Sequence, residues 1–225
     1  MTVPEAMRVQ ALRRFRLRRR KLPVAGGTLS LVTPDSMDRL LAGQALRHYQ
    51  RAGYLPYWAD LWPASVGMAR YLLRSGSLAG LSVMDLGCGL GLAGLAAGRQ
   101  GARVVFADQD EDALAFARFN AMHNGVSEVE TLRLDWFRST APVQVDLLLL
   151  ADVAYEKAHD EPLLRHLRHC LRPGGRALLG DPYREAAGNF LELVRKDFAV
   201  EVVETDTWFE DRRLPLRLAW ISRST

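Results

Sequence analysis

Short apolar runs alternate with amphipathic stretches through most of the chain after residue 80. The apolar runs predict buried strands at about 82–86, 103–107, 130–134, 146–151 and 176–180. Helices are predicted between and after them at about 91–100, 110–124, 161–171 and 184–196. Because strands and helices alternate strictly, we expect a parallel sheet with helices on both faces.

The pattern changes on either side of this region. After the last helix, "FAVEVVET" and "PLRLAWIS" predict two strands in succession, which suits a hairpin or a mixed sheet edge. Before the first strand, "GGTLSLV" is typical of a short strand, and Ser36 is expected to begin a helix over 36–53.

The composition narrows the class of protein. The chain has 225 residues, 48% of them hydrophobic, which suits one α/β domain over 55–225 behind an N-terminal extension over 1–54. No apolar run reaches the length of a membrane span, and the amino terminus lacks the apolar core of a secretory signal. The cysteines Cys88 and Cys170 form neither a disulfide framework nor a metal-ligand cluster, so we expect a cytoplasmic protein without a metal site.

Positive charge is concentrated near the amino terminus. The segment "RRFRLRRRK" at 13–21 carries seven cations, more than the whole net charge of +4, so the rest of the chain is net acidic. Such a run suits RNA, anionic lipid or an acidic partner protein, and it equally suits a solvated lead-in segment. The pattern indicates no particular oligomeric state.

A glycine-rich segment follows the first strand of the alternating region. "VMDLGCGLGLAG" at 83–94 contains glycines at positions 87, 89, 91 and 94. Such loops bring a strand into a helix around a nucleotide-like ligand, and the last three glycines fit the dinucleotide fingerprint. However, Asp85 stands just before the loop, and the loop contains no Lys or Arg. A pyrophosphate would be repelled there, so NAD(P) is disfavoured.

Four carboxylates are predicted at the same edge of the sheet. Successive strands end with or just before Asp85, Asp108, Asp135 and Asp152. The carboxyl ends of parallel strands form the ligand-binding rim of such a sheet. An adenosine ligand that carries a sulfonium and an ammonium would be attracted to this rim, and S-adenosylmethionine is that ligand. The alternative is that each Asp only marks a strand end, where turns favour it.

The chemistry suggests a role for each of several side chains. Gly87 and Gly89 would let the backbone approach the methionine part of the ligand, because a side chain would fill that space. Asp108 is placed to accept hydrogen bonds from the ribose hydroxyls. Asp135 is placed to accept from the adenine amino group, with Trp136 covering the adenine face.

These segments resemble a known family. "VMDLGCGLGLAGLAA", "VVFADQDEDAL", "LRLDW" and "VDLLLLADVAYE" resemble the successive motifs of class I S-adenosylmethionine-dependent methyltransferases. "PYWADLWPAS", the Asp135–Trp136 pair and the Asp-x-x-Tyr of Asp152 and Tyr155 are similar to the branch of small protein-lysine methyltransferases that includes the enzyme acting on the electron-transfer flavoprotein β subunit. The resemblance implies a Rossmann-like, mostly parallel sheet of seven strands in the order 3-2-1-4-5-7-6, with the last strand antiparallel.

The resemblance also implies site residues. It implies that Trp62, Gly87, Gly89, Asp108, Trp136 and Ala151 line the cofactor site, and the glycine segment and strand ends add Asp85, Cys88, Gly91 and Asp135 to the expected cofactor-binding set. Asp152 and Tyr155 are the expected catalytic residues, because they follow the fourth strand on the loop that faces the transferring methyl group in this fold. A carboxylate and an aromatic wall can hold an amine on the line of attack. The alternative for this pair is a capped turn with a packed tyrosine.

The resulting hypothesis is N-methylation of a lysine side chain of a protein by in-line transfer. The alternatives are methylation of RNA, with residues 13–21 as an RNA contact, methylation of a small molecule, or a non-catalytic module that binds an adenosyl ligand. Methylation of base amino groups in this fold uses Asn/Asp-Pro-Pro-Tyr/Phe after the fourth strand, where this chain reads "ADVAY". The partial match "DPY" at 181–183 follows the fifth strand instead.

Overall fold

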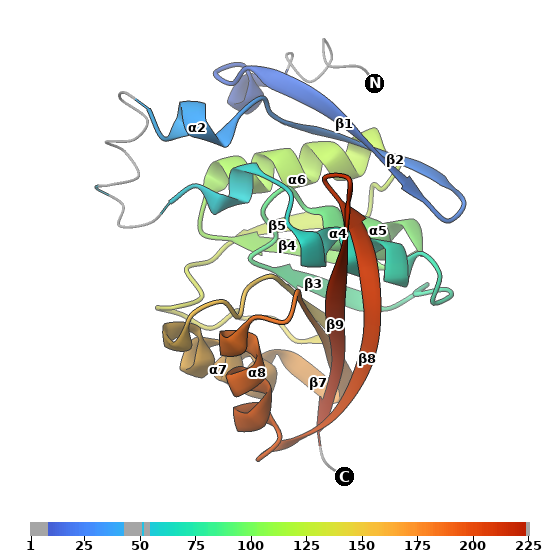
Figure 1. Ribbon diagram of the computed structural model, residues 1–225, viewed down its shortest axis with the longest axis vertical. Coiled ribbons are helices and arrows are strands. Elements are labelled where there is room, and N and C mark those ends of the chain that lie inside the picture. Colours follow the sequence, from blue (N-terminus) through green and yellow to red (C-terminus); the bar gives the residue numbers. More distant parts are fainter. Residues whose placement is uncertain (1–8, 43–50, 52–54, 224–225) are drawn as a thin grey trace.

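A seven-stranded sheet with helices on both faces forms the centre of the molecule (Figure 1). The computed structural model describes residues 9–42, 51 and 55–223. The strands of this sheet are β3 (Ser82–Leu86), β4 (Arg103–Asp108), β5 (Val129–Arg133), β6 (Val145–Ala151), β7 (Leu171–Asp181), β8 (Phe198–Phe209) and β9 (Arg212–Arg223). They lie in the order β5-β4-β3-β6-β7-β9-β8, which is 3-2-1-4-5-7-6 when the strands of this sheet are counted along the chain. β9 runs antiparallel to both of its neighbours, so the predicted sheet is confirmed.

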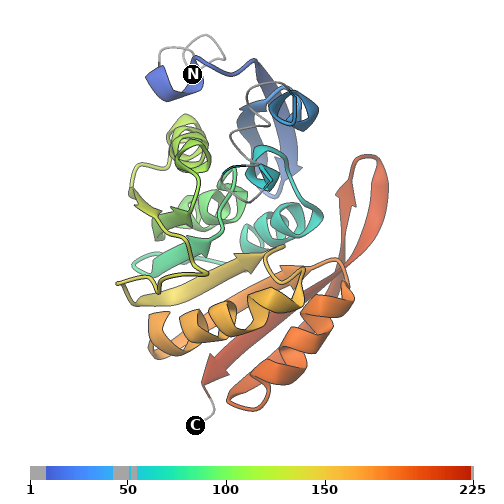
Figure 2. The same cartoon turned by 90° about the vertical axis from the view of Figure 1, so that its left-hand side faces the viewer.

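Helices cover the two faces in separate groups (Figure 2). α4 (Pro63–Leu72), α5 (Leu92–Arg99) and α6 (Glu111–His123) lie on one face, and α7 (Asp160–Cys170) and α8 (Glu185–Val194) on the other. The continuous leucine run of β6 explains this arrangement. Leu147 and Leu149 pack into the core of the first face, and Leu148 and Leu150 into the core of the second. A strand buried on both sides reads as an unbroken apolar run, because successive side chains point to opposite faces.

Two predicted boundaries differ from the structure. β7 begins at Leu171, directly after α7, rather than at about 176. Its pairing with β6 is irregular between Val145, which pairs with Leu171, and Leu147, which pairs with Arg176. The helix expected over 36–53 begins after Ser36, but α2 covers only Met37–Leu40. Residues 43–50 and 52–54 of that expected helix lie outside the described residues.

The basic run is largely exposed, as a solvated lead-in segment would be, but it is not without secondary structure. It enters β1 (Leu17–Val24), which pairs antiparallel with β2 (Gly27–Pro34) in a separate two-stranded sheet. Within β1 only Leu22 is buried. The cations hide the apolar alternation by which a strand is usually recognised, so the strand was not predicted.

Asn120 of α6 and Asn124, which directly follows α6 as its C-cap, attach this hairpin to the core. Asn120 accepts from the backbone N–H of Val32 at 2.8 Å and donates to its carbonyl at 3.1 Å. Asn124 makes the same pair of bonds to Ser30, each 2.9 Å long. The two asparagines are four residues apart, a spacing of about 6 Å along a helix. Ser30 and Val32 are two residues apart, a spacing of about 6.6 Å along a strand, so each amide lies opposite one residue of the strand edge. The two amides therefore take the place of a third strand beside β2.

None of the helices in the described part of the chain is long and apolar enough to cross a lipid bilayer.

Candidate active site

A cavity of about 590 Å³ opens at the carboxyl ends of the central strands. Its wall contains eleven of the twelve residues predicted for cofactor binding and catalysis, namely Trp62, Asp85, Gly87, Cys88, Gly89, Asp108, Asp135, Trp136, Ala151, Asp152 and Tyr155. The four carboxylates predicted to share one rim therefore lie around a single cavity.

Gly91 is the predicted site residue that does not line the cavity. Its φ is +79°, in the left-handed region, at the N-cap of α5. A β-carbon on Gly91 would lie 2.6 Å from the β-carbon of Ala117 on α6. The residue is thus required for the turn into α5 and for the close packing of that helix against α6.

The glycines inside the cavity wall are constrained by the backbone as well as by space. Gly87 has a φ of +67°, and a β-carbon there would lie 3.0 Å from the Val153 side chain. Room for a ligand is one reason for a glycine at this position. The structure adds the left-handed turn that the chain takes as it leaves β3.

Asp85 and Asp108 are both buried, and both accept backbone hydrogen bonds from the glycine loop. Asp85 accepts from the N–H of Gly94 at 2.8 Å, and Asp108 accepts from the N–H of Gly89 at 3.0 Å. Burial raises the pKa of Asp85 to about 7, partly opposed by the Gly94 N–H, and raises the pKa of Asp108 to about 6. A cation bound between these carboxylates would favour their ionised forms.

The adenine-side residues predicted from "LRLDW" form a short aromatic wall. Trp136 is buried and stacks on Phe137, with the ring centroids 4.5 Å apart. Asp135 accepts from the N–H of Phe137 at 3.1 Å and pairs with Arg138 at 3.3 Å. Both predicted residues therefore face the cavity next to a second aromatic ring.

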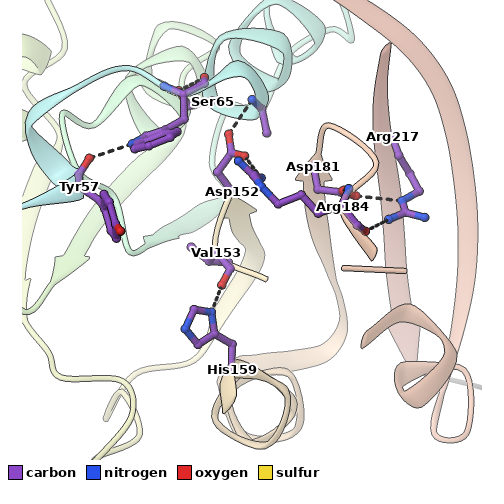
Figure 3. A network of polar contacts seen from close by, with 10 residues as sticks. Tyr57, Ser65, Asp152, Val153, His159, Asp181, Arg184 and Arg217 are labelled. Carbon is purple, nitrogen blue, oxygen red and sulfur yellow. Dashed lines mark hydrogen bonds and ion pairs between the residues drawn. The ribbon is translucent and has the colours of Figure 1, made fainter. Parts of the chain in front are cut away.

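Asp152 is held on two sides (Figure 3). One carboxylate oxygen accepts from the N–H of Ala64 at 2.7 Å, in the first turn of α4, and the other pairs with the guanidinium of Arg184. The residue has a φ of +58°, and its side chain is 5% exposed. Burial raises the pKa of Asp152, against the attraction of Arg184.

The loop that carries Arg184 is itself fastened to the sheet. Asp181, at the end of β7, accepts from the backbone N–H of Arg184 at 2.7 Å and from Nε of Arg217 on β9 at 2.9 Å (Figure 3). The Arg217 guanidinium also donates to the Arg184 carbonyl at 3.4 Å. Asp181 is 1% exposed, so this fastening is buried. It fixes the guanidinium of Arg184 opposite Asp152.

Aromatic rings surround the part of the cavity next to Asp152. Tyr57 meets both Trp62 and Tyr155 edge to face, with centroids 5.8 and 6.1 Å apart, and the Trp62 indole N–H donates to the Tyr57 carbonyl at 2.8 Å. Tyr155 in turn lies edge to face with His159, at 4.3 Å. Nδ1 of His159 donates to the Val153 carbonyl at 2.7 Å, which can only accept, and burial lowers the pKa of this imidazole.

Comparison with known proteins identifies the family. Residues 50–197 match the family model described as lysine methyltransferase. The chain belongs to the lysine methyltransferase family. The electron transfer flavoprotein beta subunit lysine methyltransferase of Danio rerio is 36% identical over 132 residues, which are 57% of this chain and 51% of the relative. Protein N-lysine methyltransferase METTL21A of Mus musculus is 32% identical over 157 residues, 66% of this chain and 72% of that protein.

A solved structure agrees with this membership at the level of the fold. N-methyltransferase NodS from Bradyrhizobium japonicum, in complex with S-adenosyl-L-homocysteine, superposes with a TM-score of 0.56 at 16% identity, covering 84% of this chain and 97% of NodS. The chain spans about half the length of the Danio rerio relative, so the match describes the shared part of that protein only.

Phe137, His159 and Arg184 are among the residues in or beside the cavity that the sequence did not identify as part of the site. Phe137 and His159 line the cavity, and Arg184 pairs with Asp152 without lining it. For Phe137 its place beside Trp136 was a usable signal, since aromatic neighbours often stack. For Arg184 no local pattern marks the role, because its partner Asp152 lies 32 residues earlier in the chain. His159 contacts Val153 and Tyr155 on its own loop, but no motif marks these contacts in the sequence.

Proposed function

We propose that this protein transfers a methyl group from S-adenosylmethionine to the side-chain amine of a lysine in another protein. The observation that carries the proposal is the meeting of Asp85, Asp108, Asp135 and Asp152, from the ends of four successive strands, around one cavity. A cavity walled by carboxylates favours a cationic ligand and a cationic acceptor. Membership of the lysine methyltransferase family, and the lysine substrates in the relatives' names, support lysine as the acceptor.

The residues present fit an adenosyl sulfonium ligand. Each carboxylate oxygen of Asp108 accepts one backbone N–H, from Asp110 and from Gly89, and retains a lone pair for a ribose hydroxyl. Trp136 and Phe137 offer an apolar wall for adenine, and the backbone at Gly87 carries no side chain into the cavity wall. The cavity volume of about 590 Å³ falls within the range of small-molecule sites. When bound, S-adenosylmethionine supplies a methyl group on a positively charged sulfur.

The chain's own task is to bring a lysine amine to that methyl group and to exclude water. The lysine ammonium must first lose a proton to solvent, because only the neutral amine has a lone pair; its nitrogen would then take the methyl group of the bound ligand, with S-adenosylhomocysteine as the leaving group. Tyr57, Trp62 and Tyr155 provide aromatic surface for the lysine stem and its cationic head. Asp152 adds negative charge beside them, shared with Arg184. We assign Asp152 and Tyr155 as the groups that place the amine.

The test is to incubate the purified protein with radiolabelled S-adenosylmethionine and a cell lysate separated into protein, RNA and small-molecule fractions. We expect label on protein, lost when lysine amines are blocked beforehand and when Asp108→Asn replaces the wild type. Asp152→Ala is expected to lose transfer while retaining cofactor affinity. Label confined to RNA or to small molecules would contradict the lysine proposal. Binding of the ligand without any transfer would indicate a non-catalytic module.

The domain division, the RNA contact and the cellular location stay predictions. The division into an extension over 1–54 and a domain over 55–225 is tested by limited proteolysis. A contact between residues 13–21 and RNA is tested by a binding assay at low salt. A cytoplasmic location is tested by cell fractionation.

A further inference from the structure

The cations of the amino-terminal run lie on an exposed strand beside the cavity, with Arg16 and Arg18 toward one face of β1 and Arg19 and Lys21 toward the other. Arg16, Arg18, Arg19 and Lys21, here called the basic strand surface, are all exposed and lie on or just before β1. β1 pairs only with β2 among the described strands, and β2 is attached to α6 on its other side, so β1 forms the outer edge (Figure 1). Within the described part of the chain no strand pairs with the second edge of β1, and an added chain could pair there.

The same segment is connected to the cavity wall by direct contacts. Arg20 of β1 pairs with Asp60 at 2.8 Å, and Phe15 meets Trp58 edge to face with centroids 5.9 Å apart. Trp58 and Asp60 both line the cavity. A chain bound along β1 would thus lie within one layer of side chains of the methyl-transfer site.

The surface is held in place before any partner arrives. Asn120 and Asn124 fix β2 to α6 through four hydrogen bonds, and Arg19 donates from Nε to Oγ of Ser30 at 2.8 Å across the hairpin. Pre-organised charge of one sign raises the rate of encounter with an oppositely charged partner. Four exposed cations in six residues repel one another in the free protein, and an acidic partner relieves that repulsion.

The chemistry of this surface favours an acidic protein segment over RNA. Surfaces for single-stranded nucleic acid combine cations with aromatic rings on which bases stack. Residues 16–34 contain no aromatic residue. The nearest ring of the run, Phe15, is 8% exposed and packs against Trp58 and Phe116. An open strand edge also offers the backbone N–H and C=O groups that an extended peptide pairs with.

We propose that the basic strand surface docks an acidic segment of the substrate protein and so selects lysines that lie near such a segment. The proposal rests on the protein-lysine methyltransferase function proposed above. It assigns the selection of substrate lysines to residues outside the cavity, because the chemistry of the cavity alone does not provide that selection.

The first test measures binding without turnover. The probe is poly-L-glutamate, and the variants are R16E/R18E/K21E and a control with the same change in charge, R103E/R195E/K196E. Arg103 begins β4, at the end of the sheet away from the cavity, and Arg195 and Lys196 follow α8; all three are exposed. We expect the first variant to lose poly-L-glutamate affinity about tenfold or more at low salt, and the control to retain most of it. Equal affinities in the two variants would overturn the proposal.

The second test measures methylation of lysate proteins by the full chain. We expect R16E/R18E/K21E to label them about tenfold more slowly than the control variant, with the difference shrinking as salt is added. Equal rates in the two variants would overturn the docking proposal while leaving the methyltransferase proposal intact. If the wild type transfers no label but the first test succeeds, docking stands and the proposed function fails.

Two control measurements test whether the three substitutions act on docking alone. Thermal unfolding and S-adenosylmethionine binding of R16E/R18E/K21E should match the control variant, because the three side chains are exposed and are not among the residues that line the cavity. If either changes strongly, the neutral variant R16Q/R18Q/K21Q replaces it, with an expected loss in the same direction. If ribonuclease treatment of the lysate removes the difference in rate, the surface acts through RNA and the proposal is wrong.

Discussion

Asp152 and Arg184 form an ion pair between the loop after β6 and the loop after β7. The carboxylate is almost fully buried and the guanidinium is 30% exposed, and the remaining carboxylate oxygen accepts from the Ala64 N–H. Asp152 therefore joins two loops and the first turn of α4. The charge that faces the acceptor site is not that of a free carboxylate, because Arg184 shares it.

Removing both members of this pair should destabilise the fold by less than the two single removals added together. Arg184→Met leaves a buried carboxylate without its cation, which we expect to lower the free energy of unfolding by about 2 kcal/mol, less than for a fully buried pair because Arg184 is partly exposed. In Asp152→Asn/Arg184→Met the loss should be smaller than the sum of the two single losses. Urea denaturation measures the free energy of unfolding of the wild type, Asp152→Asn, Arg184→Met and the double variant. Arg195→Met, which breaks an exposed pair with Glu192, is the control, with a change of about 0.5 kcal/mol or less. Strict additivity would show that the ion pair has no coupling energy.

Stability of the ligand-free protein should depend on pH through Asp85 and Asp108. Their pKa values are raised in the folded state to about 7 and about 6, from a usual 3.8. The folded state thus binds protons more tightly than the unfolded state, so this contribution is fully present below pH 3.8 and is lost as the pH rises through 6 and 7. Asp85→Asn should flatten this part of the stability curve. Thermal unfolding at a series of pH values measures it, and an unchanged slope in the variant would contradict the assignment.

The affinity for S-adenosylmethionine should depend on the ionisation of the same two carboxylates. S-adenosylmethionine carries a positive sulfur, so its affinity should rise as Asp85 and Asp108 ionise between pH 5.5 and 7.5, by about tenfold. S-adenosylhomocysteine, whose sulfur is uncharged, should show a smaller rise. Calorimetric titrations with both ligands make the comparison, and parallel pH profiles would show that the carboxylates do not sense the sulfonium.

Asp108 should contribute strongly to binding itself. Asp108→Ala removes the acceptor proposed for the ribose hydroxyls, and we expect affinity for S-adenosylmethionine to fall by about 1–3 kcal/mol. Asp112→Ala is a matched control, since Asp112 lies on the same segment but does not line the cavity. Calorimetry that shows no ligand binding to the wild type, or a preference for NAD, would contradict the cofactor assignment.

The pair Asn120 and Asn124 should decide whether the hairpin stays attached. Asn120 is fully buried and bonds to Val32 twice and to the Leu90 carbonyl, so Asn120→Ala leaves these groups unpaired and should cost about 2–4 kcal/mol. Asn124→Ala, at a part-buried position, should cost less. Hydrogen exchange should show faster exchange at Val32 in the first variant. Exchange that is unchanged there would mean that packing, rather than the two amides, holds β2.

The sequence by itself determined the sheet and the acidic rim. Strand ends are local properties, read from where an apolar run stops, and parallel strands necessarily bring their carboxyl ends to one edge. Asp85 and Asp108 could therefore be assigned to one cavity without any coordinates. The glycine spacing likewise located the turn into α5, but not which glycine lines the cavity, because Gly91 differs from Gly87 only in what packs against it.

The tertiary structure decided the contacts between distant segments. Arg184 reaches Asp152 only because β6 and β7 are neighbours in the sheet and because Asp181 and Arg217 fix the loop after β7. Asn120 bonds to Val32, which lies 88 residues earlier in the chain. The sequence does not predict this bond, because a buried asparagine on a helix resembles any other polar position until its partner strand is placed. The basic run shows most clearly what only the tertiary structure decides. Its composition fixed the charge, but only its pairing with β2 placed that charge on an outer strand beside the cavity wall, because strand pairing is a long-range property that composition does not encode.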